Sequence, residues 1–212
     1  MIVISTPTGQ IGAAVAASLR SSGEPLRLIV RDPSRLPQSL REDAEIVPGS
    51  HSDPAVLRAA LPGADALFVL VPPDFSASDV MQHYLGFARP VAEAVREFGV
   101  PQVVAVSSLG RGFHEPAGML SAAWAMDEAI EASGAAYRSL QPPFFMENLL
   151  HQAELIGNQG LFVLAADPDV PYPAVAVRDI ADVAARLLRD RSWTGQQGVP
   201  VREPADHTPR EL

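Results

Sequence analysis

The sequence begins with a short apolar run and then reads Ser5-Thr6-Pro7-Thr8-Gly9-Gln10-Ile11-Gly12. The apolar run, residues 2–5, predicts a short buried strand, and the alanine-rich segment from Gln10 to about Ser22 predicts a helix. Gly9 would let the backbone come close to a phosphate, and Gly12 would let the helix pack tightly on the strand. The first N–H groups of a helix also attract anions. This stretch therefore predicts the phosphate-binding turn of an α/β sheet.

The turn alone leaves several interpretations open. Thr6 stands where the first of the usual three glycines would be, and Pro7 supplies no N–H group, so a simple tight turn is one alternative. The hydroxyl-rich residues 5–9 also resemble the FMN phosphate loop of flavodoxins. A dinucleotide is the third interpretation, and the next predicted strand, residues 26–30, favours it.

Arg31 follows that strand, about 20 residues past the turn, where a dinucleotide fold places the group that faces the adenosine ribose. An arginine there suits the 2′-phosphate of NADP(H), and Arg35 could reach the same phosphate. Asp32 is an acid that would suit the ribose of NAD(H), so NAD(H) stays open. Solvated surface charge is the alternative explanation for both arginines.

Strand and helix patterns alternate along the rest of the chain. Further strands are predicted at residues 44–47, 66–71, 102–106 and 136–140, and helices at 54–61, 78–98 and 121–132. This alternation predicts a Rossmann-type, doubly wound parallel sheet with right-handed crossovers. We expect a dinucleotide-binding domain over residues 1–142. A small substrate-side lobe over residues 143–212 would also carry returning strand and helix elements of the main domain.

Composition excludes several classes of protein. The 212 residues carry a net charge of −9, too acidic for a nucleic-acid binder. No apolar run approaches the ~20 residues that span a bilayer, so no membrane partner is expected. Cysteine is absent and the five histidines share no ligand spacing, so we expect neither disulfides nor a metal site. The expected location is cytoplasmic.

Several segments together resemble the NmrA-like family of atypical short-chain dehydrogenases/reductases. They occur in that family's order over nearly the whole chain: Thr8–Gly12, Val30–Pro33, Ser133–Tyr137, Gln141–Asn148 and Val177–Ala181. The flavodoxin interpretation has no place for the last two segments. The family's chains usually continue for several tens of residues past residues 203–212, so we expect a short lobe with an open pocket.

The resemblance implies that NADP(H) is the preferred cofactor and that a small molecule is the substrate; a homodimer is left open. It implies contacts to the cofactor's pyrophosphate from Thr6, Thr8, Gly9, Gln10 and Ile11. Arg31 and Arg35 would face the adenosine end, with Val71 and Pro72 beside the ribose. The residues near the nicotinamide would be Ser107, Ser108, Pro143 and Phe144, and those near the substrate Phe144, Phe145 and Asn148.

Each of these later residues also has a simpler explanation. Phe144 and Phe145 would serve equally as core residues, and the two serines could satisfy backbone groups at a strand end. Asn148 could simply be a hydrogen-bonding residue at a helix start.

All 16 basic residues are arginine, so the Tyr-x-x-x-Lys pair of typical short-chain dehydrogenases cannot exist here. Tyr137 is followed four residues later by Gln141, and its position inside a strand favours a role in the core. Hydride transfer can still run on orientation alone, because the cofactor carries the chemistry. The sequence thus leaves two hypotheses: a reductase of small quinones, imines or similar acceptors, with no catalytic residue assigned, and a non-catalytic NADP(H)-sensing protein.

Overall fold

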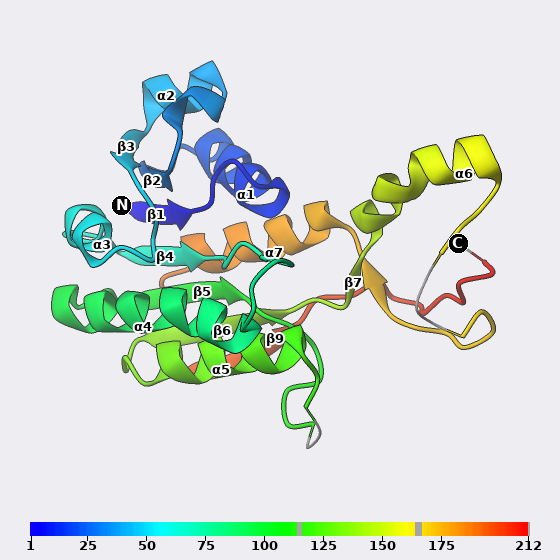
Figure 1. Ribbon diagram of the computed structural model, residues 1–212. Coiled ribbons are helices and arrows are strands. Elements are labelled where there is room, and N and C mark those ends of the chain that lie inside the picture. The colour runs from blue at the N-terminus through cyan, green and yellow to red at the C-terminus, as the bar shows by residue number, and fades with distance from the viewer. Residues whose placement is uncertain (114–115, 164–166, 212) are drawn as a thin grey trace.

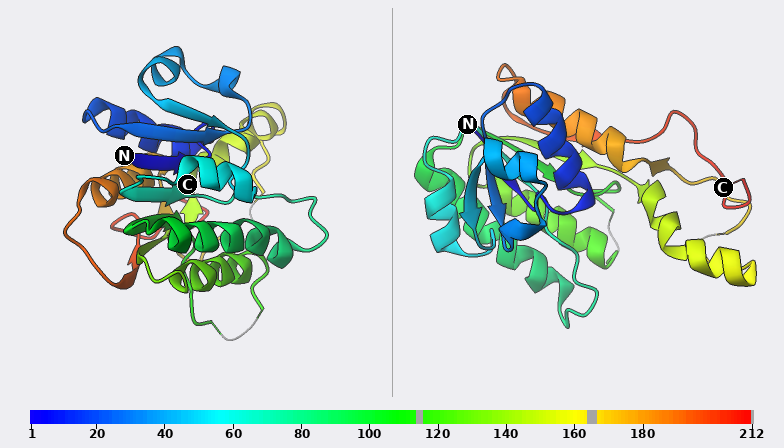
Figure 2. Two further views of the ribbon diagram at one scale, coloured as in Figure 1. Left: turned by 90° about the vertical axis from the view of Figure 1, so that its left-hand side faces the viewer. Right: turned by 90° about the horizontal axis from the view of Figure 1, so that it is seen from above.

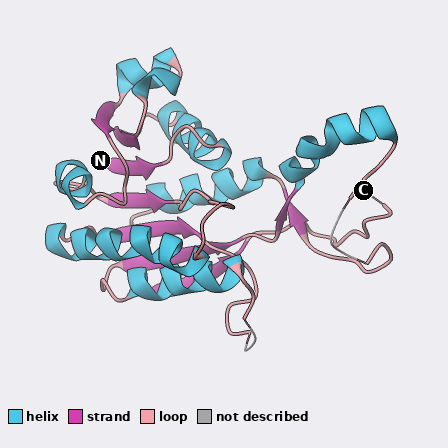
Figure 3. Cartoon of the chain, viewed as in Figure 1, coloured by secondary structure: helices cyan, strands magenta, loops and turns pink. Residues whose placement is uncertain are grey.

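The computed structural model describes residues 1–113, 116–163 and 167–211. Three positions of the predicted lobe and its last residue, Leu212, therefore lie outside the described residues. A seven-stranded parallel sheet runs through the centre, in the order β3-β2-β1-β4-β5-β6-β9 (Figure 1). Helices lie on both faces of this sheet (Figure 3). The predicted fold class is confirmed.

The elements have the following bounds. The strands are β1 Ile2–Ser5, β2 Leu26–Val30, β3 Glu45–Pro48, β4 Ala66–Val69, β5 Gln102–Val106, β6 Ala136–Gln141, β7 Phe144–Phe145, β8 Ala174–Val175 and β9 Gln196–Pro200. The α-helices are α1 Gln10–Ser21, α2 Gln38–Asp43, α3 Pro54–Ala60, α4 Val80–Phe98, α5 Met119–Glu131, α6 Ala153–Gln159 and α7 Val177–Arg189. The 3-10 helices within the described residues are η1 Pro33–Arg35 and η2 Met146–Gln152.

The strand order places a topological switch at β1. Ile2 of β1 pairs with Leu26 of β2 on one side and with Ala66 of β4 on the other. The chain therefore builds outward from β1 in one direction and then in the other. Such a reversal leaves a crevice beyond the carboxyl ends of the central strands, where doubly wound sheets bind ligands.

Two hydrophobic clusters hold the layers together. On one face, α1 and α7 pack side by side over the sheet and bury residues such as Val15, Leu19 and Leu188. On the other face, α3, α4 and α5 bury a second cluster that includes Val91 and Met126 (Figures 1 and 2). Both faces of the sheet are covered, which explains why β4 is apolar throughout and β5 is apolar after Gln102.

Local signals set several boundaries near those predicted. Asp53 accepts a hydrogen bond from the Ala55 N–H (2.8 Å) and begins α3, and Gly99 ends α4 in the left-handed conformation. Other boundaries differ from the prediction by one or two residues, as at α5, which begins at Met119 rather than at residue 121. Two of the differences have a visible cause. Helix α4 begins at Val80 rather than at residue 78 because Asp79 caps it. The predicted strand 66–71 ends at Val69, because the next N–H group, that of Leu70, bonds to the Ser5 hydroxyl (3.0 Å).

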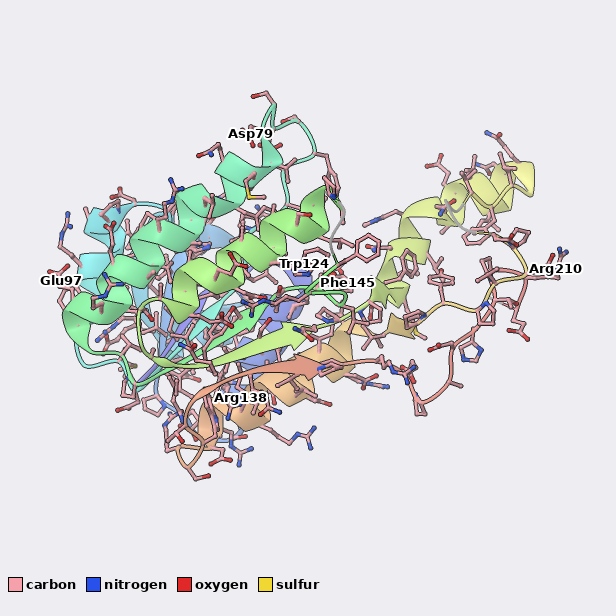
Figure 4. All side chains as sticks on the ribbon, turned by 90° about the horizontal axis from the view of Figure 1, so that it is seen from below. Asp79, Glu97, Trp124, Arg138, Phe145 and Arg210 are labelled. Carbon is pink, nitrogen blue, oxygen red and sulfur yellow. The ribbon has the colours of Figure 1, made fainter. Side chains whose placement is uncertain are left out.

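After β6 the chain leaves the sheet and forms an arm, residues 146–160, made of η2 and α6. The arm extends beyond the carboxyl ends of the strands, and Phe145 lies where it departs (Figures 1 and 4). The chain then returns through β8 and α7, and β9 adds the last strand beside β6. Within the ranges given above, none of the helices is both long and apolar enough to cross a bilayer.

Candidate functional site

The turn between β1 and α1 is held in an unusual conformation. Thr6 has φ 51°, a left-handed backbone conformation that a β-branched residue rarely adopts. Its carbonyl accepts the N–H of Gly9 (3.1 Å), and its hydroxyl lies 3.5 Å from the carbonyl oxygen of Leu70. Thr6 therefore takes the conformation expected of the missing first glycine, and hydrogen bonds tie the turn to the segment after β4.

The two glycines of the turn serve different purposes. A Cβ on Gly12 would lie 2.2 Å from the Thr6 carbonyl oxygen, so α1 rests directly on the turn. The sequence predicted a close approach of helix and strand, whereas the contact is with the turn. Gly9 has φ −84°, which any residue adopts, and its Cβ would meet only that same oxygen, at 3.6 Å. The fold does not require a glycine at position 9, so a simple tight turn does not explain it.

The first turn of α1 is open to an anion. No side chain caps this helix, and its first turn contains no acidic residue. The leading N–H groups and the positive end of the helix dipole are therefore available beside Gly9. Of the predicted contacts, Gln10 is exposed at this end, while the Ile11 side chain is buried and could contribute only through its backbone.

A cleft of about 340 Å³ continues from this turn across the carboxyl ends of β2 and β3. Its lining includes five of the predicted cofactor residues. The full set is Thr6, Pro7, Thr8, Ile29, Val30, Arg31, Asp32, Arg35, Gly49, Ser50, His51, Pro72 and Phe87. Val71 was predicted beside Pro72 at the ribose, but its side chain is 4% exposed and belongs to the core.

The charges of the cleft favour an anion. Among the described residues, neither Arg31 nor Arg35 forms an ion pair. The Asp32 carboxylate instead accepts hydrogen bonds from the N–H (3.0 Å) and hydroxyl (2.6 Å) of Ser34, which lower its pKa. Asp32 thus caps η1, and the two arginines remain available to a ligand.

His51 lines the same cleft and was not predicted from the sequence. Its ring is 3% exposed and lies 4.6 Å from that of Phe87. Its Nε2 has no hydrogen-bond partner among the described residues. Burial, with a smaller contribution from the Arg31 charge, lowers its pKa to about 4. The residues before it, Gly49-Ser50, could have marked a strand end in the sequence, but not a buried ring.

The end of β5 is organised around a buried carboxylate. Asp127 of α5 accepts hydrogen bonds from the hydroxyls of Ser107 (2.7 Å), Ser139 (2.8 Å) and Tyr137 (2.5 Å). Burial raises its pKa, although the three hydrogen bonds act in the opposite direction. Tyr137 is a core residue, as expected. The carbonyl of Ser108 accepts the indole N–H of Trp124 (3.3 Å), so both serines predicted near the nicotinamide are attached to α5.

The segment after β6 places aromatic side chains where the arm departs. Phe144 and Phe145 form β7, which pairs with β8. Phe144 is half-buried, and its ring lies 5.6 Å from that of Tyr172 in an edge-on arrangement. Phe145 packs against the core on the α1 and α7 face, in keeping with the alternative of core packing. Pro143 is partly exposed just before them.

Glu147 connects residues 141–148 with residues 177–181, two segments that are far apart in the sequence. Both of its carboxylate oxygens lie 2.9 Å from the N–H of Val177, which begins α7. The residue preceding that helix is Ala176, which has no side-chain oxygen to cap it. Glu147 therefore caps α7 from 30 residues away. Asn148, the next residue, is exposed on η2, and no hydrogen bond of its side chain occurs within the described residues.

Comparison with known proteins agrees with this arrangement. A family model described as NAD(P)H-binding matches residues 7–191. An NADPH-dependent quinone oxidoreductase from Escherichia coli, whose structure was solved with NADPH, is 25% identical to this chain and superposes with a TM-score of 0.84. The match covers 98% of this chain and 71% of the oxidoreductase chain.

Two curated relatives are also reductases. The NAD(P)H azoreductase of Xenophilus azovorans is 27% identical over 205 residues, 96% of this chain and 68% of that protein. The (4-alkanoyl-5-oxo-2,5-dihydrofuran-3-yl)methyl phosphate reductase of Streptomyces griseus is 31% identical over 200 residues, 93% of this chain and 65% of that protein. The chain thus spans about two thirds of the length of these relatives.

Proposed function

Because the chain belongs to the NAD(P)H-binding family, we propose that its cleft holds NADP(H) and that it reduces a small, flat acceptor. The cofactor, when bound, supplies a hydride. The residues of this chain bind the cofactor, orient it and shape the space beside it. The activity, the acceptor and the preference for NADP(H) over NAD(H) are all part of this proposal.

The observation that carries the proposal is the open space around Gly9. The fold does not need a glycine there, and the helix beside it begins without a cap or an acid. A diphosphate explains both features, because its oxygens need backbone N–H groups at close range. Thr6, Thr8 and Pro72, which line the same cleft, would surround it.

The preference for NADP(H) rests on the charges at the other end of the cleft. Arg31 and Arg35 would bind the 2′-phosphate, whereas one oxygen of the Asp32 carboxylate is engaged by Ser34, which leaves only the other for a ribose hydroxyl. A charge-assisted contact is worth about 1.5–3 kcal/mol, or about 10- to 100-fold in affinity.

Calorimetric titration of both cofactors tests this assignment. We expect Arg31→Ala to weaken NADP+ binding by about 10- to 100-fold and to leave NAD+ binding nearly unchanged. Arg41→Ala, which removes an exposed arginine of α2 outside the cleft, is the matched control. Equal affinity of the wild type for the two cofactors, or an unchanged preference for NADP+ in Arg31→Ala, would show that Arg31 does not select NADP(H).

The acceptor would lie against the aromatic pair of Phe144 and Tyr172. An edge-on pair of rings, only partly buried, offers an apolar surface that suits a flat molecule. The names of the relatives, an azoreductase and a quinone oxidoreductase, support acceptors of that shape.

The acceptor should also need little help from an acid. The hydroxyls of Ser107 and Tyr137 both donate to Asp127, and the chain has no lysine to assist a tyrosine. Quinones and imines should therefore be reduced faster than simple ketones, whose alkoxide product demands a proton donor. Loss of NADPH absorbance with quinones, imines, azo dyes and ketones measures this order of rates, and fast ketone reduction would contradict it.

Phe144→Ala should impair quinone turnover, whereas Leu150→Ala, an exposed change on η2, should not.

The same hydroxyl arrangement favours a second candidate, a protein that senses NADP(H) without turnover. In that case tight cofactor binding would accompany no oxidation of NADPH by any acceptor of the panel. The titration and the absorbance assay together separate the two functions.

A further inference from the structure

The buried ring of His51 has no task in the cofactor contacts described above. It lines the cleft with Arg31 and Arg35, yet it is 3% exposed and its Nε2 lacks a partner among the described residues. Buried polar atoms are nearly always hydrogen-bonded, so an unpartnered ring nitrogen at the wall of a cleft calls for an explanation. Packing alone would have been served better by an apolar residue against Phe87.

We propose that His51 takes up a proton when a 2′-phosphate enters the cleft and so becomes a third positive charge for that phosphate. The inference rests on the proposed function, because it needs a phosphorylated adenosine in this cleft. It goes beyond that function by making the choice between NADP(H) and NAD(H) depend on pH. His51 would be a specificity-determining residue that acts mainly through its charge.

The groups facing His51 explain why the free ring is neutral. Arg31, after β2, repels a positive charge on the ring, and the carboxylate of the neighbouring Asp32 bonds to Ser34 rather than to the ring. On the following loop, Asp53 caps α3. On α4 the ring meets the uncharged Phe87. His83 lies beyond Phe87, with its Nε2 2.8 Å from the Pro72 carbonyl oxygen. None of these groups supplies the ring with a negative partner.

A bound 2′-phosphate would reverse this balance. It carries between one and two negative charges near neutral pH, and in a partly buried cleft those charges are screened less than in water. The same phosphate would neutralise the repulsion from Arg31 and favour the protonated ring. NAD(H) has only a hydroxyl in that place and would leave the ring neutral. Proton uptake should therefore accompany NADP+ binding alone.

Calorimetry in two buffers of different ionisation enthalpy counts the protons taken up. At pH 6 we expect the wild type to take up at least ~0.5 proton more per NADP+ bound than His51→Phe, which keeps an aromatic ring against Phe87. The ratio of NADP+ to NAD+ affinity should rise by about two- to tenfold from pH 8 to pH 6 in the wild type, relative to the variant. Protonation of the phosphate itself is common to both proteins and cancels. His151→Phe, a change on the exposed surface of η2, should behave as the wild type does.

A proton NMR titration of the His51 ring gives a second measurement that needs no variant. Its midpoint should move from about 4 in the free protein to above ~6 with saturating NADP+, and should stay low with NAD+. An unchanged midpoint, or equal proton uptake by the wild type and His51→Phe, would overturn this inference while leaving the proposed cofactor intact. Failure of NADP+ to bind the wild type at pH 8 would overturn both.

Discussion

Replacing Gly12 by alanine should move α1 away from the turn that carries Thr6. The new Cβ would lie 2.2 Å from the Thr6 carbonyl oxygen and 2.9 Å from its carbon. Both atoms belong to backbone that hydrogen bonds hold in place, so no flexible side chain can give way. Relief requires a shift of about 1 Å between the helix and the turn, because non-bonded heavy atoms prefer separations near 3.5 Å.

The expected loss follows from two opposing terms. Overpacking costs about 1–3 kcal/mol, and contact with fixed backbone places this substitution near the upper value. Alanine also favours a helix over glycine by about 1 kcal/mol. The net loss in the free energy of unfolding is then about 2 kcal/mol, or about 4–8 °C in Tm for a chain of this length.

Thermal unfolding followed by circular dichroism measures this loss, and Gly86→Ala is the matched control. Gly86 is exposed within α4, and a Cβ there would meet nothing within 4 Å. The control should therefore gain about 0.5–1 kcal/mol from helix propensity alone. If Gly12→Ala were as stable as the wild type, or were stabilised like the control, α1 would not rest on the turn.

Three further predictions concern the same regions. Gly9→Val should remain folded, because the φ of −84° at position 9 suits valine. It should no longer bind NADP+ in a calorimetric titration, and normal binding would mean that the turn holds no diphosphate. Glu147→Ala should lower the free energy of unfolding, measured by urea denaturation, by about 1–2 kcal/mol, because α7 loses its cap. Glu93→Ala, on the exposed side of α4, is the control and should change this free energy little. Equal effects of the two substitutions would show that Glu147 does not stabilise α7 as a cap. The free energy of unfolding should fall as the pH drops from 6.5 to about 4, because His51 takes up a proton in the unfolded chain at a higher pH than in the native state. The loss is about 3 kcal/mol for the full shift of the His51 pKa. It should be absent in His51→Phe, and equal pH dependence of stability in the two proteins would exclude His51 as its source.

The sequence predicted the elements of the sheet because their signals are local. The run 66–71 is apolar without interruption, and Asp53-Pro54 has the side chain and the backbone that a helix start requires. The places of Gly9 and Arg31 were also predictable. Gly9 stands in the turn after β1 and Arg31 directly follows β2, and the strands of a parallel sheet end at one edge. The direction of a side chain at a strand end was less predictable: Val71 was predicted beside the ribose, and its side chain is buried in the core.

What the sequence could not predict are contacts between side chains far apart in the chain. Glu147 was quoted only as part of the segment Gln141–Asn148, yet it caps a helix that begins 30 residues later. Asp127 stands on a helix without any pattern that marks it. Of its three hydroxyl partners, Ser107 directly follows β5, whereas Tyr137 and Ser139 lie within β6. His51 is a single histidine in a loop. Its burial and its lowered pKa depend on Phe87 and Arg31, which only the fold brings beside it.

The arm has a consequence for how proteins of this architecture could diversify. Neither η2 nor α6 contains a buried residue, so substitutions along residues 146–160 disturb little of the core, except at Glu147, which caps α7. Exposed positions of this kind usually tolerate exchange within about 0.5 kcal/mol. Helix α7 and strand β9, by contrast, are built into the sheet on which the nucleotide turn depends. Mutation can therefore vary the surface of the arm while the sheet stays constant, and directed evolution of the proposed reductase should begin with the arm.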